Sequence, residues 1–236
     1  MTSLPFTVEP GTIAIFSDLI CPFAHVTLHR LFTTRTRLGL GDAIRFEHHA
    51  FPIELLNLAP GTRHGSDSEI PALGPLEPDA GWQIWQGPDY HYPNSVLLAF
   101  EAVQAATTQS LRIGEDYDRA IRQAFWSESR PIQMHHELIA IAKTVHDLNV
   151  GQLATALRHG TYRSAVFDDF DLAKTDIVAM SPHLFLTDGT NAANPGINVH
   201  WQGPWAQGFP VIDADEPTAI EQLLRHAEAL LLPTEH

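Results

Sequence analysis

Cys21 is the only cysteine in the 236-residue chain. It follows an apolar run, residues 12–17, whose β-branched and aromatic side chains predict a buried strand. Pro22 comes next, a residue suited to the first turn of a helix, where no backbone N–H donor is needed. A thiol at that junction faces unpaired N–H groups and the positive end of the helix dipole, which favour the thiolate. Position alone leaves two interpretations open: a reactive nucleophile, or a small buried hydrophobic residue.

The residues around Cys21 predict a strand–helix–strand unit. Apolar residues at near-helical spacing indicate a helix that begins at Pro22 and ends at Gly39 or Gly41. Alternating apolar and polar residues over 44–51 predict a second strand. We expect the two strands to pair in parallel, through a right-handed crossover.

A long stretch without strand character follows this unit. Residues 54–92 are punctuated by Pro and Gly and predict an irregular segment, with a short helix around Trp82. Asn94 and Ser95 carry helix-capping side chains and precede an apolar run, so we expect a helix to begin there. Further helices are expected at 115–127, 133–148, 149–158 and 161–172.

Strand character returns toward the end of the chain. Residues 183–186 follow Pro182 and precede an Asp-Gly turn, which predicts a strand, and another short strand is expected at 197–200. An apolar stripe over 217–232 predicts a final helix.

This order predicts an α/β fold in which both ends of the chain build one sheet. The helical block is then an insertion into that fold. We expect residues 1–53 and 173–236 to form the sheet-bearing domain and residues 54–172 to form a helical insertion domain.

Residues 17–25, Ser-Asp-Leu-Ile-Cys-Pro-Phe-Ala-His, resemble the strand–Cys-Pro-x-Cys–helix site of the DsbA-like thioredoxin superfamily. They look closest to its cytoplasmic branch of FrnE-like oxidoreductases. The superfamily also contains the kappa-class glutathione transferases and the 2-hydroxychromene-2-carboxylate isomerases. Residues 180–185 match its cis-proline motif, with Ser181-Pro182 as the cis bond. The resemblance implies a thioredoxin-like fold with a large all-helical insertion between the βαβ unit and the cis-proline strand.

Ala24 stands where the motif has its second cysteine. A two-cysteine enzyme attacks with its first thiolate and resolves the mixed disulfide with its second thiol, which this chain cannot do internally. The resemblance therefore implies a monothiol DsbA-family thiol–disulfide oxidoreductase with Cys21 as its catalytic residue. No tightly bound cofactor is implied, but a low-mass thiol such as glutathione or mycothiol fits. Two alternatives stay open: a low-mass-thiol-dependent transferase or isomerase, and a binding module without redox activity.

The resemblance also indicates which side chains surround the substrate. In the family the backbone beside the cis-proline pairs with an extended peptide or a thiol cofactor, and the main helix of the insertion overhangs the site. The residues expected to bind substrate are Pro22, Phe23, Ala24, His25, Asn94, Ser181 and Pro182.

Charged neighbours could raise or lower the pKa of the Cys21 thiol. A charged His25 would lower the pKa of Cys21, whereas Asp18 would oppose the thiolate or accept its proton. Cys21, His25 and His29 recur every four residues, but no fourth ligand is visible, so we expect no metal site.

Composition restricts the partners and the compartment. Twenty-eight acidic residues against fourteen Lys and Arg give a formal charge of −14, which argues against nucleic acid or an anionic membrane as a partner. No uninterrupted apolar window is long enough to span a bilayer. Residues 1–10 lack a signal-like pattern, and a lone cysteine suits a reducing compartment, so we expect a cytoplasmic location. Expected partners are small-molecule thiols or disulfides or a protein disulfide, and a homodimer is among the assemblies allowed.

Overall fold

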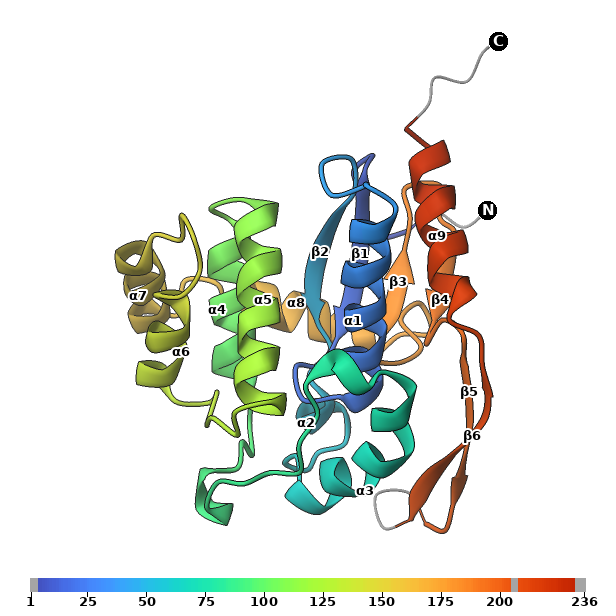
Figure 1. Ribbon diagram of the computed structural model, residues 1–236. Coiled ribbons are helices and arrows are strands. Elements are labelled where there is room, and N and C mark those ends of the chain that lie inside the picture. Colours follow the sequence, from blue (N-terminus) through green and yellow to red (C-terminus); the bar gives the residue numbers. More distant parts are fainter. Residues whose placement is uncertain (1–3, 205–207, 232–236) are drawn as a thin grey trace.

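The computed structural model describes residues 4–204 and 208–231. Four strands form one sheet in the order β2-β1-β3-β4 (Figure 1). β1 and β2 pair in parallel as predicted, whereas β3 runs antiparallel to both β1 and β4. The sheet is thus built from both ends of the chain. Its strands are β1 (Thr12–Ser17), β2 (Arg45–Ala50), β3 (His183–Phe185) and β4 (Asn191–Ala193).

Alternate residues of β1 are buried on opposite faces of the sheet, as the period of two in a strand requires. Ile13 and Ile15 pack with apolar residues of α1 (Pro22–Arg37) and α9 (Thr218–Ala229). Phe16 packs on the other face with Phe185 and with the segment that precedes β1. Figure 1 shows α1 and α9 side by side along the sheet. This packing fixes the position of α1, and therefore of the residue that precedes it.

No strand lies between residues 53 and 173, all of which the structure describes. A second apolar core forms among the longer helices of this segment, and α4 and α5 rest against β2. Their bounds are α4 (Leu97–Thr107), α5 (Leu111–Trp126), α6 (His135–Ala142), α7 (Val150–His159) and α8 (Arg163–Ala173). The predicted order of elements is confirmed, and the division into two domains stays a prediction. Within the described residues no helix is long and apolar enough to cross a membrane.

The segment predicted to be irregular contains more helix than expected. It forms α2 (Ile53–Leu56), α3 (Arg63–Leu73) and three single 3₁₀ turns, η1 (Gly74–Leu76), η2 (Pro78–Ala80) and η3 (Asp89–His91). The predicted helix around Trp82 is wrong, because that residue lies between η2 and η3. α3 was missed because Gly65 and Pro71 lower its helix propensity.

The capping prediction for Asn94 and Ser95 is also wrong. α4 begins at Leu97, and its N-cap residue, Val96, makes no side-chain cap. Glu54 of α2 takes that role instead: its carboxylate accepts hydrogen bonds from the Val96 amide (2.9 Å) and from the Ser95 hydroxyl (2.7 Å). A cap supplied by a residue forty positions away leaves no local pattern in the sequence.

A two-stranded hairpin precedes the last helix. It consists of β5 (Ile197–Gln202) and β6 (Phe209–Asp215). β6 lies beside α3 (Figure 1). The strand predicted at 197–200 is confirmed and extends two residues further. β4 and β6 were not predicted. The final helix is confirmed over 218–229, whereas residue 232 of its predicted span lies outside the described residues.

A buried ion pair fastens α1 to α5. Arg35 donates two hydrogen bonds to Glu115, at 2.9 and 2.8 Å, and Glu115 also accepts the backbone N–H of Phe46 in β2. Both side chains are almost completely buried, so neither charge is solvated by water.

We expect Glu115→Gln to lower the free energy of unfolding by about 3–5 kcal/mol, because it leaves Arg35 buried without a counter-charge. Urea unfolding measures this difference. Glu221→Gln is the matched control, since it removes the exposed carboxylate partner of Arg37 on the same helix and should cost less than about 1 kcal/mol. Equal losses in the two variants would contradict this role for the pair.

Candidate active site

Cys21 is the N-cap residue of α1, four residues after the end of β1. Pro22 occupies the first helical turn as predicted, and the Cys21 carbonyl accepts the N–H of His25 at 3.0 Å. The Cys21 side chain makes no cap of its own, and only 7% of the residue is exposed.

The Cys21 sulfur lies beside the loop that leads into β3. Its thiol donates to the carbonyl oxygen of Ser181 at 3.4 Å, and the Ser181–Pro182 peptide bond is cis. In return, the Ser181 hydroxyl accepts the backbone N–H of Asp18 at 2.8 Å. The predicted cis bond and its proximity to the sulfur are both confirmed. Two segments 160 residues apart therefore meet at the thiol.

Arg122 of α5 forms hydrogen bonds with the end of β1 and with the loop between β1 and α1. Its guanidinium donates to the Asp18 carbonyl and to the Ser17 hydroxyl, both at 2.8 Å. Asp118, one turn earlier on α5, accepts from the Arg122 Nε at 2.8 Å and balances its charge. Sequence reasoning missed Arg122, because nothing local in a helix 104 residues away marks it as a partner of this loop.

The Asp18 carboxylate closes the same loop from within. It accepts the N–H of Ile20 at 2.8 Å and that of Ile53 at 3.0 Å. Burial nevertheless raises the pKa of Asp18 to about 7, and the nearby Glu54 carboxylate acts in the same direction. Asp18 therefore changes its charge near neutral pH.

A second carboxyl group, Glu69 of α3, also acts on the thiol. Burial raises the pKa of Glu69 to about 7. Across residues 4–204 and 208–231, its carboxylate has neither an ion pair nor a hydrogen bond. It belongs to the helix that the sequence did not predict, which is why this neighbour of Cys21 was not anticipated.

The expectation of a depressed thiol pKa is wrong for this resting state. Burial raises the pKa of Cys21 to about 12, and the charges of Glu69 and Asp18 add to the effect. Hydrogen bonds from Ser181 and from the Ala24 backbone act in the opposite direction but are weaker. The Ala24 backbone N–H, in the first turn of α1, favours the thiolate, but desolvation outweighs it.

His25 does not supply a positive charge to the thiol. Burial lowers its pKa to about 3, so the ring is neutral. Its Nε2–H donates to the Ala80 carbonyl at 2.8 Å, and the ring packs between Trp82 and Trp126. The predicted activation of Cys21 by a charged His25 is therefore wrong.

The other predicted site residues have different environments. Ala24 is fully buried, and Phe23 is half-buried against a small cluster that includes Leu73 of α3. Asn94 is exposed just before α4, and its contact with substrate stays a prediction. No group of three or more His, Cys, Asp or Glu side chains in the described part of the chain is placed to hold a metal ion.

Comparison with known proteins identifies the family. The sequence matches the DSBA-like thioredoxin domain over residues 12–189, so the chain belongs to this family. The thioredoxin-like α/β fold and the DsbA-like resemblance inferred from the sequence are thereby confirmed. A search of curated proteins finds no match.

Two solved structures share the fold. A probable DsbA oxidoreductase from Streptomyces coelicolor is 15% identical, with a TM-score of 0.65 over 95% of this chain and 93% of that chain. The cytosolic disulfide reductase DsbM from Pseudomonas aeruginosa is 17% identical, with a TM-score of 0.60 over 77% of this chain and 87% of that chain. At such identities the similarity extends to the fold and no further.

We expect Glu69→Gln to lower the pKa of the Cys21 thiol, because it removes a negative charge that disfavours the thiolate. Each unit by which this pKa falls increases the thiolate fraction at neutral pH about tenfold. The rate of alkylation by iodoacetamide, measured from pH 6 to about pH 10, reports the change.

Asp42→Asn serves as the control. Asp42 is fully exposed just before the start of β2, so its substitution should leave the alkylation profile unchanged. A profile for Glu69→Gln that coincides with that of the parent protein would remove Glu69 from the electrostatics of the site.

Proposed function

We propose that this protein is a monothiol thiol–disulfide oxidoreductase that acts through Cys21 and uses a low-mass thiol in place of a second cysteine. The observation that carries the proposal is the position of the sulfur, 3.4 Å from the Ser181 carbonyl and beside cis-Pro182. An extended substrate backbone lying along residues 181–182 would bring its disulfide to this sulfur.

The first step is removal of the thiol proton. A carboxyl group with a pKa near 7 is partly ionised at neutral pH and can serve as a general base. Asp18 has that property and lies in the same loop. Transfer of the proton from Cys21 to the Asp18 carboxylate moves the negative charge from the carboxylate to the sulfur. The net charge of the buried site therefore does not change. Asp18 is thus proposed as the proton acceptor.

The second step is exchange. The Cys21 thiolate attacks one sulfur of a disulfide R–S–S–R, forming a mixed disulfide with R–S and releasing R–S⁻, which takes up a proton. Ala24 cannot resolve this adduct. A low-mass thiol G–SH then attacks the R sulfur, releases Cys21 and forms G–S–S–R. The net reaction is R–S–S–R + G–SH → G–S–S–R + R–SH, with glutathione or mycothiol as suitable thiols.

The burial of Cys21 and its high pKa support slow, selective exchange rather than general thiol reactivity. Substrates must be small, or present an exposed disulfide on an extended segment. We include a cytoplasmic location in the proposal, since the reductant is a low-mass thiol kept reduced in that compartment. The P. aeruginosa structural relative is described as a cytosolic disulfide reductase.

The proposal is tested by reduction of bis(2-hydroxyethyl) disulfide with glutathione. A second glutathione converts the product G–S–S–R to glutathione disulfide, which glutathione reductase reduces with NADPH. The parent protein should catalyse this exchange above the uncatalysed rate, and Cys21→Ser should fall to that background. If Cys21→Ser binds a low-mass thiol and retains turnover of an electrophile, a thiol-dependent transferase or isomerase replaces the proposal. If neither protein binds or exchanges thiols, a binding module does.

Ala24→Cys should restore the two-cysteine arrangement. Residue 24 lies one turn after Cys21, where side chains three positions apart are neighbours, so the two Cα atoms are expected to meet the requirement of about 4.4–6.8 Å for a disulfide. Under mild oxidant the variant should lose the mass of two hydrogens. Its dithiol form, regenerated with dithiothreitol, should reduce insulin disulfides without added glutathione and become oxidised to the internal disulfide. Ala24→Ser, which adds a polar atom but no thiol, is the control. A folded Ala24→Cys protein that stays reduced would contradict the proposed geometry.

A further inference from the structure

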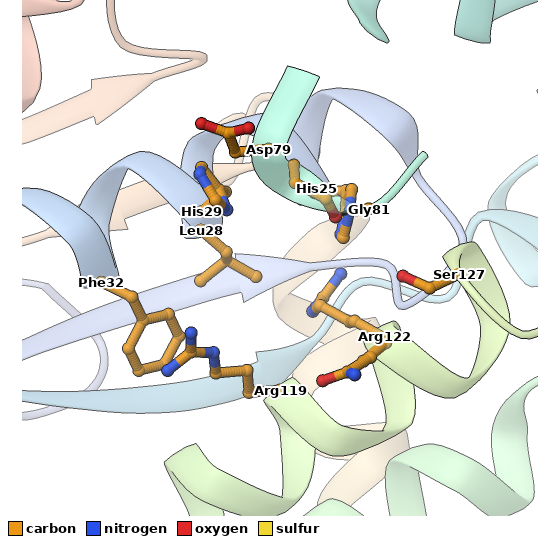
Figure 2. A pocket seen from close by; sticks show the side chains of 11 residues that line it. His25, Leu28, His29, Phe32, Asp79, Gly81, Arg119, Arg122 and Ser127 are labelled. Carbon is orange, nitrogen blue, oxygen red and sulfur yellow. Dashed lines mark hydrogen bonds between the residues drawn. The ribbon is translucent and has the colours of Figure 1, made fainter. Parts of the chain in front are cut away.

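A cavity of about 220 Å³ lies between α1, η2 and α5, and Cys21 does not line it (Figure 2). One face of α1 supplies Leu28 and Phe32, four residues apart as neighbours on a helix surface. α5 supplies Arg119 and Gln123 in the same way. The Arg35–Glu115 pair fixes the two helices that form two walls of the cavity, and η2 forms the third.

Arg119 carries the uncompensated charge in this cavity. Arg122 also lines it, but its guanidinium is fully engaged with Asp118 and with the loop below Cys21. Among the described residues, Arg119 and Arg158 are the arginines with no carboxylate within 4.0 Å. Such a cation stands out in a chain with twice as many acidic as basic residues.

Arg119 is an exposed residue, and its guanidinium lies over the Phe32 ring at the cavity wall. Its Cζ atom lies 5.1 Å from the centre of the Phe32 ring, a distance that allows a cation–π contact. Phe32 itself is buried, because its ring also packs on Phe46. Figure 2 shows Arg119, Phe32 and Leu28 on one side of the cavity. A charged group therefore stands next to an apolar wall.

The remaining lining restricts the charge of a ligand. Burial lowers the pKa of His29, and the charge of Arg119 acts in the same direction, so this ring is neutral at pH 7 although Glu77 opposes the effect. Asp79, on η2, lines the cavity as well and would repel a second negative charge. Gln123 and Ser127 provide neutral hydrogen-bonding groups. A single negative charge fits this set better than the two charges of a phosphate.

We infer that this cavity binds a small organic carboxylate, with the carboxylate group at Arg119 and an apolar body against Leu28 and Phe32. A planar guanidinium matches a carboxylate geometrically, through two parallel hydrogen bonds. The volume is below the range of about 300–1,000 Å³ of pockets for drug-sized ligands, so the ligand is a molecule of about one ring or one short chain. Cys21 does not line the cavity, so the inference does not rest on the proposed exchange reaction.

The test uses 3-phenylpropanoate as the probe, with its uncharged amide and inorganic phosphate as comparisons. Isothermal titration calorimetry at low ionic strength measures binding to the parent protein. Tryptophan fluorescence gives a second signal, because His25 of the cavity packs on Trp126 and Trp82. We expect saturable binding of the carboxylate and much weaker binding of the amide and of phosphate.

Arg119→Gln should weaken binding of 3-phenylpropanoate by about tenfold or more, since a charge-assisted hydrogen bond is lost. Arg119→Lys should keep part of the affinity. Arg158→Gln is the matched control, removing an unpaired arginine on α7 outside the cavity, and should bind like the parent. The inference is overturned if no carboxylate binds, if the amide binds equally well, or if Arg119→Gln and Arg158→Gln behave alike.

Discussion

The guanidinium of Arg122 is the contact on which the site depends most. It lies in the interface between α5 and the end of β1, donates to the Asp18 carbonyl and the Ser17 hydroxyl, and is balanced by Asp118. Removing either member of such a buried pair leaves an uncompensated charge, which is far more costly than losing an exposed pair. The loop that presents Cys21 is thus fastened to the helical segment as well as to the sheet.

The same burial that orders this loop determines the chemistry of its thiol. Desolvation and two nearby carboxyl groups favour the neutral form of Cys21, against the weaker influence of the helix N-terminus. In the resting protein the proton is held between the sulfur and the Ser181 carbonyl. Reactivity then requires a substrate that takes the place of this hydrogen bond and a base that takes the proton. Asp18, whose pKa is near 7, is the base assigned in the proposed reaction.

Local patterns in the sequence were sufficient for the elements that carry the thiol. A β-branched run, a Cys-Pro step and an amphipathic stripe predicted β1, the start of α1 and the parallel pairing with β2. The meeting of Cys21 with Ser181 and Pro182 came from the family resemblance, because no local pattern links residues 160 positions apart. The segment between β2 and β3 was correctly predicted to be helical, but the predicted ends of its helices differ from the observed ones.

What could not be predicted depends on long-range burial. The direction of the Cys21 pKa follows first from burial of the thiol and then from the charge of Glu69 on α3, a helix that was not predicted because of Gly65 and Pro71. His25 has the right spacing to face Cys21, yet it turns to the Ala80 carbonyl between two tryptophans. β4 and β6 consist mostly of exposed or half-buried residues, so neither has the apolar pattern that indicates a strand.

The central claim, that the Cys21 sulfur is the exchanging atom, is tested most directly by intact-mass spectrometry. The folded protein is incubated with glutathione disulfide at neutral pH, and a sample unfolded in urea shows that the reagent itself can modify the chain. We predict one glutathione adduct on the folded protein, mapped to Cys21 and removed by excess thiol. An unmodified folded protein beside a fully modified unfolded sample would contradict the claim and leave Cys21 as a buried residue of the core.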